Sequence, residues 1–248
     1  MAGGWPVGVL FALLGAGAAW GLFQTYHPVF RVPAELASIE MPNSRQAAEI
    51  RAAEIKAGLL NALLVLGWTG ALLAGAMAAG QACARRSWRI ALFGMIGCGL
   101  AGALFGALAG WAGHVVYHLL LIPFEGATDL KRTVVVQAVM LGTLCGGVGL
   151  VLGALTGFGR AMWTRLLGGV LAGISAGMVF PFVAGYFFPK THVGYVLPRD
   201  GTGAILWLTV TAICFGLIVP ELTLRRTCDA RGDDEVPVPE ESAAPLSG

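Results

Sequence analysis

The sequence predicts an all-α integral membrane protein with about six transmembrane helices. Hydrophobic residues make up 56% of the 248 positions and charged residues only 12%, whereas charged residues make up about 25% of an average soluble domain. Apolar runs recur along the chain and the mean hydropathy is +0.75, so most of the surface is expected to face lipid. The net charge of +2 is small and no dense run of Lys or Arg occurs, which argues against a nucleic-acid partner.

Each predicted span is a stretch of roughly 20 mostly apolar residues, the length of helix that crosses a bilayer. Six stretches meet this condition, namely 5–23, 58–80, 90–113, 133–157, 166–188 and 203–220. We expect the first to be an uncleaved span rather than a signal peptide, because residues 1–4 hold no Lys or Arg and no small-residue cleavage site follows. Together the spans predict one membrane domain over residues 1–226.

The connection over residues 24–57 is the longest, and we expect it to be partly helical. Its first half is broken by three prolines, Pro28, Pro33 and Pro42. Asn43 or Ser44 can then cap a helix that continues into the second span. Arg45 and Glu49 are four residues apart and can form an ion pair on that helix. We interpret this segment as a solvated extension of the second span, and a cap that binds a partner is the alternative.

Glycines four residues apart recur in three spans and place a stripe of small residues along one face of each helix. Such stripes let neighbouring helix backbones approach closely. The three stripes are Gly102, Gly106 and Gly110; Gly149, Gly153 and Gly157; and Gly169, Gly173 and Gly177. They predict glycine-zipper packing, either within the chain or between copies, and they indicate no activity.

Residues 106–118 resemble residues 15–27 in the spacing of glycine, tryptophan, tyrosine and histidine. The matching pairs are Gly15 and Gly106, Trp20 and Trp111, Tyr26 and Tyr117, and His27 and His118. In the spans that follow, Asn61 corresponds to Gln137. We interpret the chain as three helical hairpins of two consecutive spans, the first two forming an internal repeat and the third divergent. Chance similarity between helices rich in glycine and alanine is the alternative.

The histidines are the candidate metal ligands of this sequence. All four fall near the outward ends of the first, third and fifth spans, at His27, His114, His118 and His192. His114 and His118 are four residues apart, so they share a helix face and could bind one metal ion, with Glu125 or Asp129 completing the site. We favour the alternative of an interfacial belt in which Trp, Tyr and His lie at headgroup level. No cofactor is indicated.

Asn61 and Gln137 are the strongest polar candidates inside the predicted spans. No Asp, Glu, Lys or Arg lies mid-span, although ion-coupled pumps and voltage sensors keep ionisable groups there. We therefore expect the two amides to form interhelical hydrogen bonds. Their alternative role is to line a path for a small solute.

Arginines gather in the short connections and indicate how the chain lies in the membrane. They are Arg85, Arg86 and Arg89, then Arg160 and Arg165, then Arg225 and Arg226. Basic residues in short connections face the cytoplasm, so we predict a multi-pass protein of the plasma (inner) membrane with both termini cytoplasmic. The tail over residues 227–248 is acidic and rich in proline, and we expect it to be disordered.

The sequence carries no recognisable catalytic motif. A GxSxG pattern at residues 173–177 lies within an apolar helix, whereas a hydrolase needs it in a strand–turn–helix. We therefore expect a non-enzymatic structural or accessory membrane component that contacts bilayer lipid, further copies of itself or another membrane subunit. The alternative is a small channel or carrier for a neutral or metal-linked solute, built on the two amides and the outer histidines.

Overall fold

The protein is an all-helical bundle in its computed structural model, which describes residues 4–39, 41–85, 88–120, 129–157, 159–187, 196–198 and 200–232. Within these ranges there are seven helices and no strand. Six of the helices are long and apolar enough to cross a membrane. The predicted helical class and the six spans are therefore confirmed, and the helices fit a multi-pass membrane protein.

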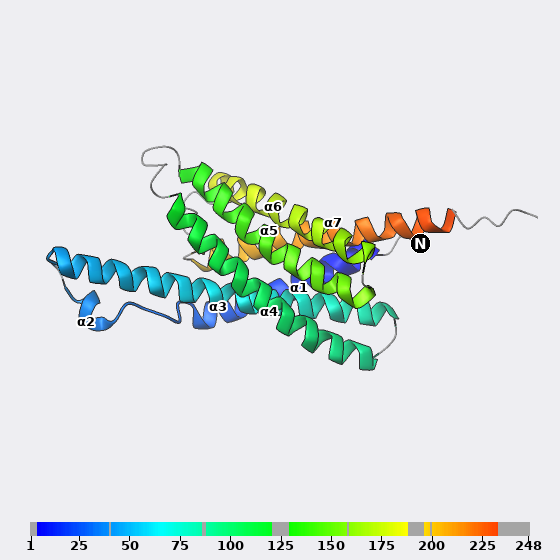
Figure 1. The fold of residues 1–248 in the computed structure, drawn as a ribbon, viewed down its shortest axis with the longest axis horizontal. Helices are drawn as coiled ribbons and strands as arrows, with labels where there is room; N and C mark the ends of the chain where they lie inside the picture. The colour runs from blue at the N-terminus through cyan, green and yellow to red at the C-terminus, as the bar shows by residue number, and fades with distance from the viewer. Residues whose placement is uncertain are drawn as a thin grey trace, which may run out of the picture.

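The helices follow one another along the chain as drawn in Figure 1. Their bounds are α1 Gly4–Tyr26, α2 Ala34–Ala37, α3 Ser44–Arg85, α4 Trp88–Leu119, α5 Asp129–Thr156, α6 Arg160–Phe187 and α7 Gly201–Gly232. Most run past the predicted spans, because apolarity marks the lipid-crossing part of a helix and not its polar ends. α7 continues to Gly232, beyond the predicted start of the tail at residue 227, and residues 233–248 lie outside the described ranges.

The predicted helical extension of the second span is confirmed as the first part of α3. The Asn43 side chain accepts a hydrogen bond from the Gln46 N–H at 2.8 Å, and the Gln46 side chain accepts one from the Asn43 N–H at 3.0 Å. This reciprocal cap satisfies two N–H groups that a helix start leaves free. The Arg45–Glu49 ion pair also forms, at 3.2 Å and well exposed. α3 has 42 residues and projects past the other helices on the side where α2 lies (Figure 1).

The six long helices form a closed ring in chain order, since α1 packs against both α3 and α7. The most extensive packing joins α3 with α4 and α5 with α6. Sequence reasoning instead grouped consecutive spans, which would pair α1 with α3, α4 with α5 and α6 with α7. Most glycines that lie against a neighbouring helix backbone are at the α3–α4 and α5–α6 crossings, whereas the α1–α3 crossing has Gly15 and the α1–α7 crossing has Gly216.

Glycines of α4 lie directly against the α3 backbone. A Cβ added to Gly106 would overlap the carbonyl oxygen of Leu66 and lie 2.7 Å from its carbonyl carbon. A Cβ added to Gly110 would lie 2.5 Å from the carbonyl oxygen of Ala62. Gly102 likewise faces Gly70 of α3. No other residue type fits these places without moving one helix away from the other.

The α5–α6 crossing has the same character. A Cβ on Gly153 would lie 2.7 Å from the Met162 Cα, and one on Gly177 would lie 2.5 Å from the Ala138 N. The other glycines that face the opposite backbone here are Gly149, Gly169 and Gly173. Gly157 differs from the expected stripe: α5 ends at Thr156, Gly157 adopts φ +138° in the turn, and a Cβ there would meet nothing within 4 Å.

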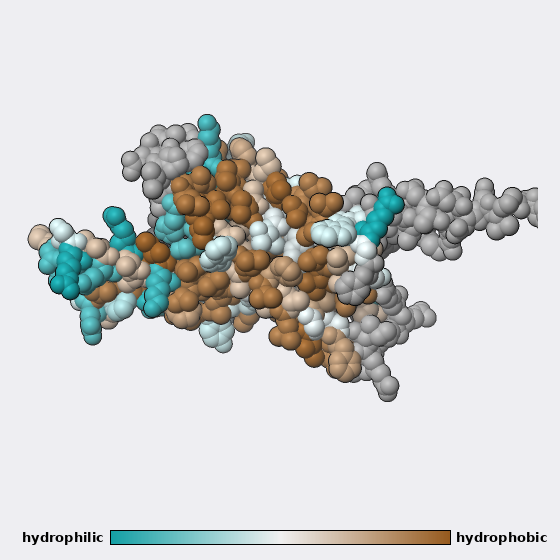
Figure 2. Space-filling view, viewed as in Figure 1, coloured by the Kyte–Doolittle hydropathy of each residue, from teal (hydrophilic) through white to brown (hydrophobic). Residues whose placement is uncertain are grey.

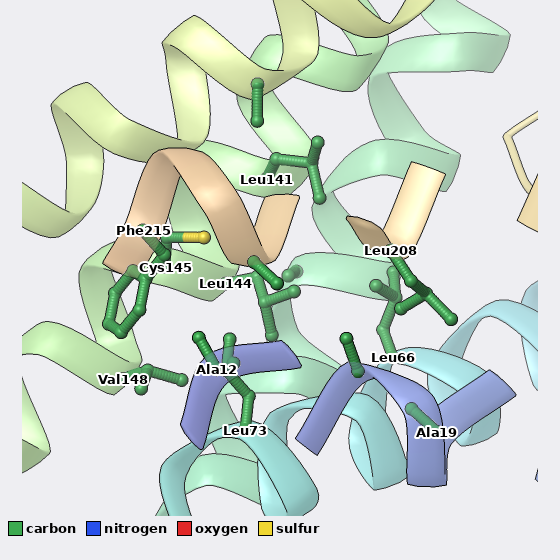
Figure 3. Packing of buried hydrophobic residues seen from close by; sticks show 14 of the residues in the cluster. Ala12, Ala19, Leu66, Leu73, Leu141, Leu144, Cys145, Val148, Leu208 and Phe215 are labelled. Atoms are coloured by element: carbon green, nitrogen blue, oxygen red, sulfur yellow. The ribbon is translucent and has the colours of Figure 1, made fainter. Parts of the chain in front are cut away.

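The centre of the core lies between α1, α3, α5 and α7 (Figure 3), and α4 and α6 add further buried residues. Its labelled members come from all four helices: Ala12, Ala19, Leu66, Leu73, Leu141, Leu144, Cys145, Val148, Leu208 and Phe215. α5 is the most covered of the six spans and α4 the least. Large apolar side chains also cover the outside, among them Leu100 and Leu104, each 70% exposed. Figure 2 shows this apolar surface over the body of the bundle and polar residues on the projecting part of α3, as lipid contact requires.

Candidate functional site

Polar side chains gather at one end of the bundle. We call it the histidine end; there α1, α4 and α6 finish and α5 and α7 begin. The opposite end, where α3 and α5 finish and α4 and α6 begin, is called the arginine end. The two predicted amides and three of the four predicted histidines lie at or near the histidine end, so any site proposed from the sequence has to be built there.

Asn61 of α3 is almost fully buried and fastens the segment that follows α1. Its side-chain oxygen accepts hydrogen bonds from the N–H groups of Val29 at 3.1 Å and Phe30 at 3.0 Å. Its amide nitrogen donates to the carbonyl oxygen of Phe30 at 2.8 Å. Three of the four hydrogen bonds that an asparagine side chain can form are therefore made within the chain.

Gln137 of α5 does the same for the start of α7. Its side chain is 1% exposed, its nitrogen donates to the carbonyl oxygen of Val196 at 3.2 Å, and its oxygen accepts from the indole N–H of Trp207 at 2.9 Å. Trp207 is itself buried. Both amides thus hold a connecting segment against the bundle, as expected of polar groups that have left water.

Two tryptophans have roles that the sequence reasoning did not assign. Trp207 completes the buried bond to Gln137, and the indole N–H of Trp20 in α1 donates to the carbonyl oxygen of Gly201 at 3.1 Å. The second bond joins the first long helix to the start of the last. An indole carries one donor and finds a partner when buried, but the partner of each lies far away in the sequence.

His114 and His118 are the two histidines that the structure brings together. Their ring centroids are 4.4 Å apart in an edge-on arrangement. The His114 ring faces α3, since a Cβ on Gly58 would lie 3.6 Å from its Cε1 atom, and its Nε2 atom is buried without a hydrogen-bond partner. Tyr117 flanks His118, and the Arg132 guanidinium lies 4.7 Å from the centre of the Tyr117 ring, a cation–π distance.

His27 lies just past the end of α1 and stacks on Phe23, with ring centroids 4.3 Å apart and an interplanar angle of 21°. Burial lowers the pKa of His27 below its usual value, because a charged imidazolium is poorly solvated there. Its Nδ1 atom is buried without a hydrogen-bond partner. The neutral ring is therefore the form that this environment accepts.

The described side chains do not assemble a three-ligand metal site. Among them, no group of three His, Cys, Asp or Glu residues lies close enough to hold a metal ion. His192, Glu125 and the side chain of Asp129 lie outside the described parts of the chain. What the geometry offers is one histidine pair on one helix face.

The histidine end thus combines three features. These are two amides engaged in structural hydrogen bonds, a histidine pair, and a separate histidine stacked on a phenylalanine. No catalytic nucleophile with an adjacent base arises from these contacts. Comparison of the chain with protein-family models, with curated proteins and with solved structures finds no match.

Proposed function

We propose that the protein is a non-enzymatic structural or accessory component of a membrane. The observation that carries this proposal is that the buried amides are engaged in bonds within the chain. Asn61 uses three hydrogen bonds to hold residues 29–30, and Gln137 uses two to hold Val196 and Trp207. A solute path needs hydrogen-bond donors and acceptors that can bind the passing solute. The side chains of Asn61 and Gln137 instead bind other parts of the chain.

Two buried hydroxyl groups support the same proposal. The Thr69 hydroxyl donates to the carbonyl oxygen of Val65 at 2.7 Å, and the Thr211 hydroxyl donates to that of Trp207 at 2.8 Å. Each bond stays within its own helix, so the single proton of each hydroxyl is already donated to the backbone. The bundle centre is filled by apolar side chains instead (Figure 3).

Glycine-zipper packing within the chain is part of the proposal. It is supported by the way the glycines of α4 and α6 face the backbones of α3 and α5, which leaves them buried inside the chain. Partner subunits or further copies would then meet the outer faces of α1 and α4, the two least covered spans. These faces carry large exposed side chains, such as Leu10 at 55% and Leu104 at 70%.

The internal repeat and the orientation also belong to the proposal. Asn61 and Gln137 are equivalent in the repeat, and each holds the backbone of a segment next to a span, either after α1 or before α7. The short connections at the arginine end are basic in sequence. We therefore infer that this end and both termini lie in the cytoplasm, and that the protein lies in the plasma membrane.

A small channel or carrier remains the second candidate, and one observation favours it. His114 is 8% exposed and its Nε2 atom has no hydrogen-bond partner, with His118 beside it. Such a pair could pass a metal ion or a neutral polar solute. The two candidates differ in one measurable property, the flux of solute across a membrane.

The test is reconstitution of the purified chain into phospholipid vesicles. Water, glycerol and Zn²⁺ entry would be followed by light scattering and an entrapped zinc dye, with protein-free vesicles as the control. If the protein is an accessory component, solute should enter these vesicles at the rate measured for the control. Mild detergent should then extract from native membranes a complex larger than the 25.7 kDa chain. Solute entry that is lost in a His114→Ala variant would establish the carrier instead.

A further inference from the structure

An apolar groove runs along the outside of the bundle at the arginine end. It has a volume of about 400 Å³ and lies between the first half of α4, the last turns of α5 and the start of α6. Its walls include Phe93, Gly97 and Cys98 of α4, Leu155 of α5 and Met162 of α6. Ligand sites for small molecules have volumes in this range, roughly 300–1,000 Å³.

The groove opens outward, toward the position of lipid in a membrane. Phe93 is 76% exposed and Leu155 is 45% exposed. The groove is narrow, because a Cβ added to Gly94 would lie 4.0 Å from the Leu155 Cδ1 atom. A helix with its side chains is about 10 Å wide and would not enter, whereas a single hydrocarbon chain would.

Glycine keeps the groove open. A Cβ added to Gly97 would meet nothing within 4 Å, and Gly97 is exposed. At the α3–α4 crossing, the backbone of α3 occupies the space beside each glycine of α4. Gly97 differs, because no protein atom lies within 4 Å of a Cβ added there. A side chain placed here would therefore occupy the groove itself.

The chain that forms this end of the groove is basic in sequence. Residues 156–170 hold Arg160 and Arg165, and neither this range nor residues 80–100 contain Asp or Glu. Arg165 donates to the carbonyl oxygen of Leu152 at 3.0 Å. Arg160 is exposed at the first turn of α6, two residues before Met162 of the groove wall. The start of a 28-residue helix adds partial positive charge there.

We propose that this groove binds an anionic phospholipid of the leaflet at the arginine end. One acyl chain lies in the groove, and the phosphate lies beside Arg160 and the first turn of α6. The charge complementarity selects an anionic lipid over a zwitterionic one, and the width of the groove selects a hydrocarbon chain over a helix. The site is independent of whether the protein is an accessory component or a carrier.

The test compares binding of phosphatidylglycerol and phosphatidylcholine with identical acyl chains to the purified full chain in detergent, measured by native mass spectrometry. The expected preference for phosphatidylglycerol is about fivefold or more, the effect of one basic residue near an anionic headgroup. Arg160→Gln should reduce the phosphatidylglycerol affinity about fivefold and leave the phosphatidylcholine affinity unchanged.

Gly97→Leu should weaken both lipids, because the leucine fills the groove. Gly185→Leu is the matched control: Gly185 is exposed on α6 and a Cβ there also meets nothing within 4 Å. Both variants should melt at or above the wild-type temperature in lipid-free detergent, because leucine favours a helix more than glycine does. This result separates loss of lipid binding from loss of fold.

Three results would overturn the proposal. Equal affinity of the wild-type chain for the two lipids would remove the headgroup site. Undiminished lipid binding by the Gly97→Leu variant would remove the acyl groove. A change in oligomeric state caused by Gly97→Leu in lipid-free detergent would identify the groove as a contact with a second copy.

Discussion

A methyl group added to Gly106 should force α4 away from α3. In the folded chain a Cβ at this position would overlap the Leu66 carbonyl oxygen and lie 2.7 Å from the carbonyl carbon, whereas ordinary contacts begin at 3.4 Å. The helices must therefore separate by at least about 0.7 Å at this crossing, since that shift relieves only the contact with the carbonyl carbon and the oxygen is closer. A gap of that size forfeits about a quarter to a half of the dispersion attraction of the neighbouring contacts.

Two opposed effects determine how much the Gly106→Ala substitution changes the free energy of unfolding. Replacing glycine by alanine within a helix favours the helix by about 1 kcal/mol. Overpacking a tight interior costs about 1–3 kcal/mol. Gly97→Ala on the same helix carries the first term without the second, since nothing lies within 4 Å of its added Cβ. Gly106→Ala should therefore be less stable than Gly97→Ala by about 1–3 kcal/mol.

The assay is reversible unfolding of both variants in mixed micelles by increasing fractions of denaturing detergent, followed by tryptophan fluorescence. The difference between the two midpoints measures the steric term alone, because the gain in helix propensity is common to both. If Gly106→Ala proved as stable as Gly97→Ala, the close α3–α4 approach would not exist in the micelle and the reasoning would be wrong.

Three further outcomes follow from the histidine end. Asn61→Leu should destabilise the fold by about 1–3 kcal/mol, because it leaves backbone groups unpaired, and should speed hydrogen exchange at residues 29–30. Trp207→Phe should cost about 2–4 kcal/mol in the same unfolding assay, through the lost bond and the gap left behind, whereas Trp111→Phe, at a residue 51% exposed, should change stability by less than about 0.5 kcal/mol. Because burial lowers the folded-state pKa of His27, stability should be full above the unfolded-state value of about 6.5 and fall as the pH drops below it. His27→Phe, which keeps the stacking on Phe23, should reduce this fall in melting temperature between pH 8 and 5.5.

The number and approximate positions of the spans could be predicted because they depend on local chemistry. Apolar length locates each lipid-crossing helix, and the Asn43 cap depends on residues three positions away. The same local rule misassigned Gly157, because the four-residue glycine spacing continues past the end of α5. A glycine after a helix end serves a turn with positive φ, and periodicity alone does not distinguish that role from packing.

The pairing of the helices and the partners of the polar groups could not be predicted. Glycine stripes identify the face of a helix that meets a neighbour, but they do not identify the neighbour. The bonds of Asn61 span 31 and 32 residues of sequence, and those of Gln137 span 59 and 70. Such contacts depend on how the whole bundle closes. The amide side chains at positions 61 and 137 predicted buried hydrogen bonds, but only the fold identifies the groups to which they bond.

The closed ring has a consequence for the order in which the protein is made. Trp20 in the first helix bonds to Gly201, 181 residues later in the chain. At translation rates of about 5–20 residues per second, that partner is synthesised on the order of ten to forty seconds after Trp20. During this interval one flank of α1 faces the membrane without α7. Until the last helix is made, the chain is therefore an open intermediate of five long helices in which the indole of Trp20 lacks its partner.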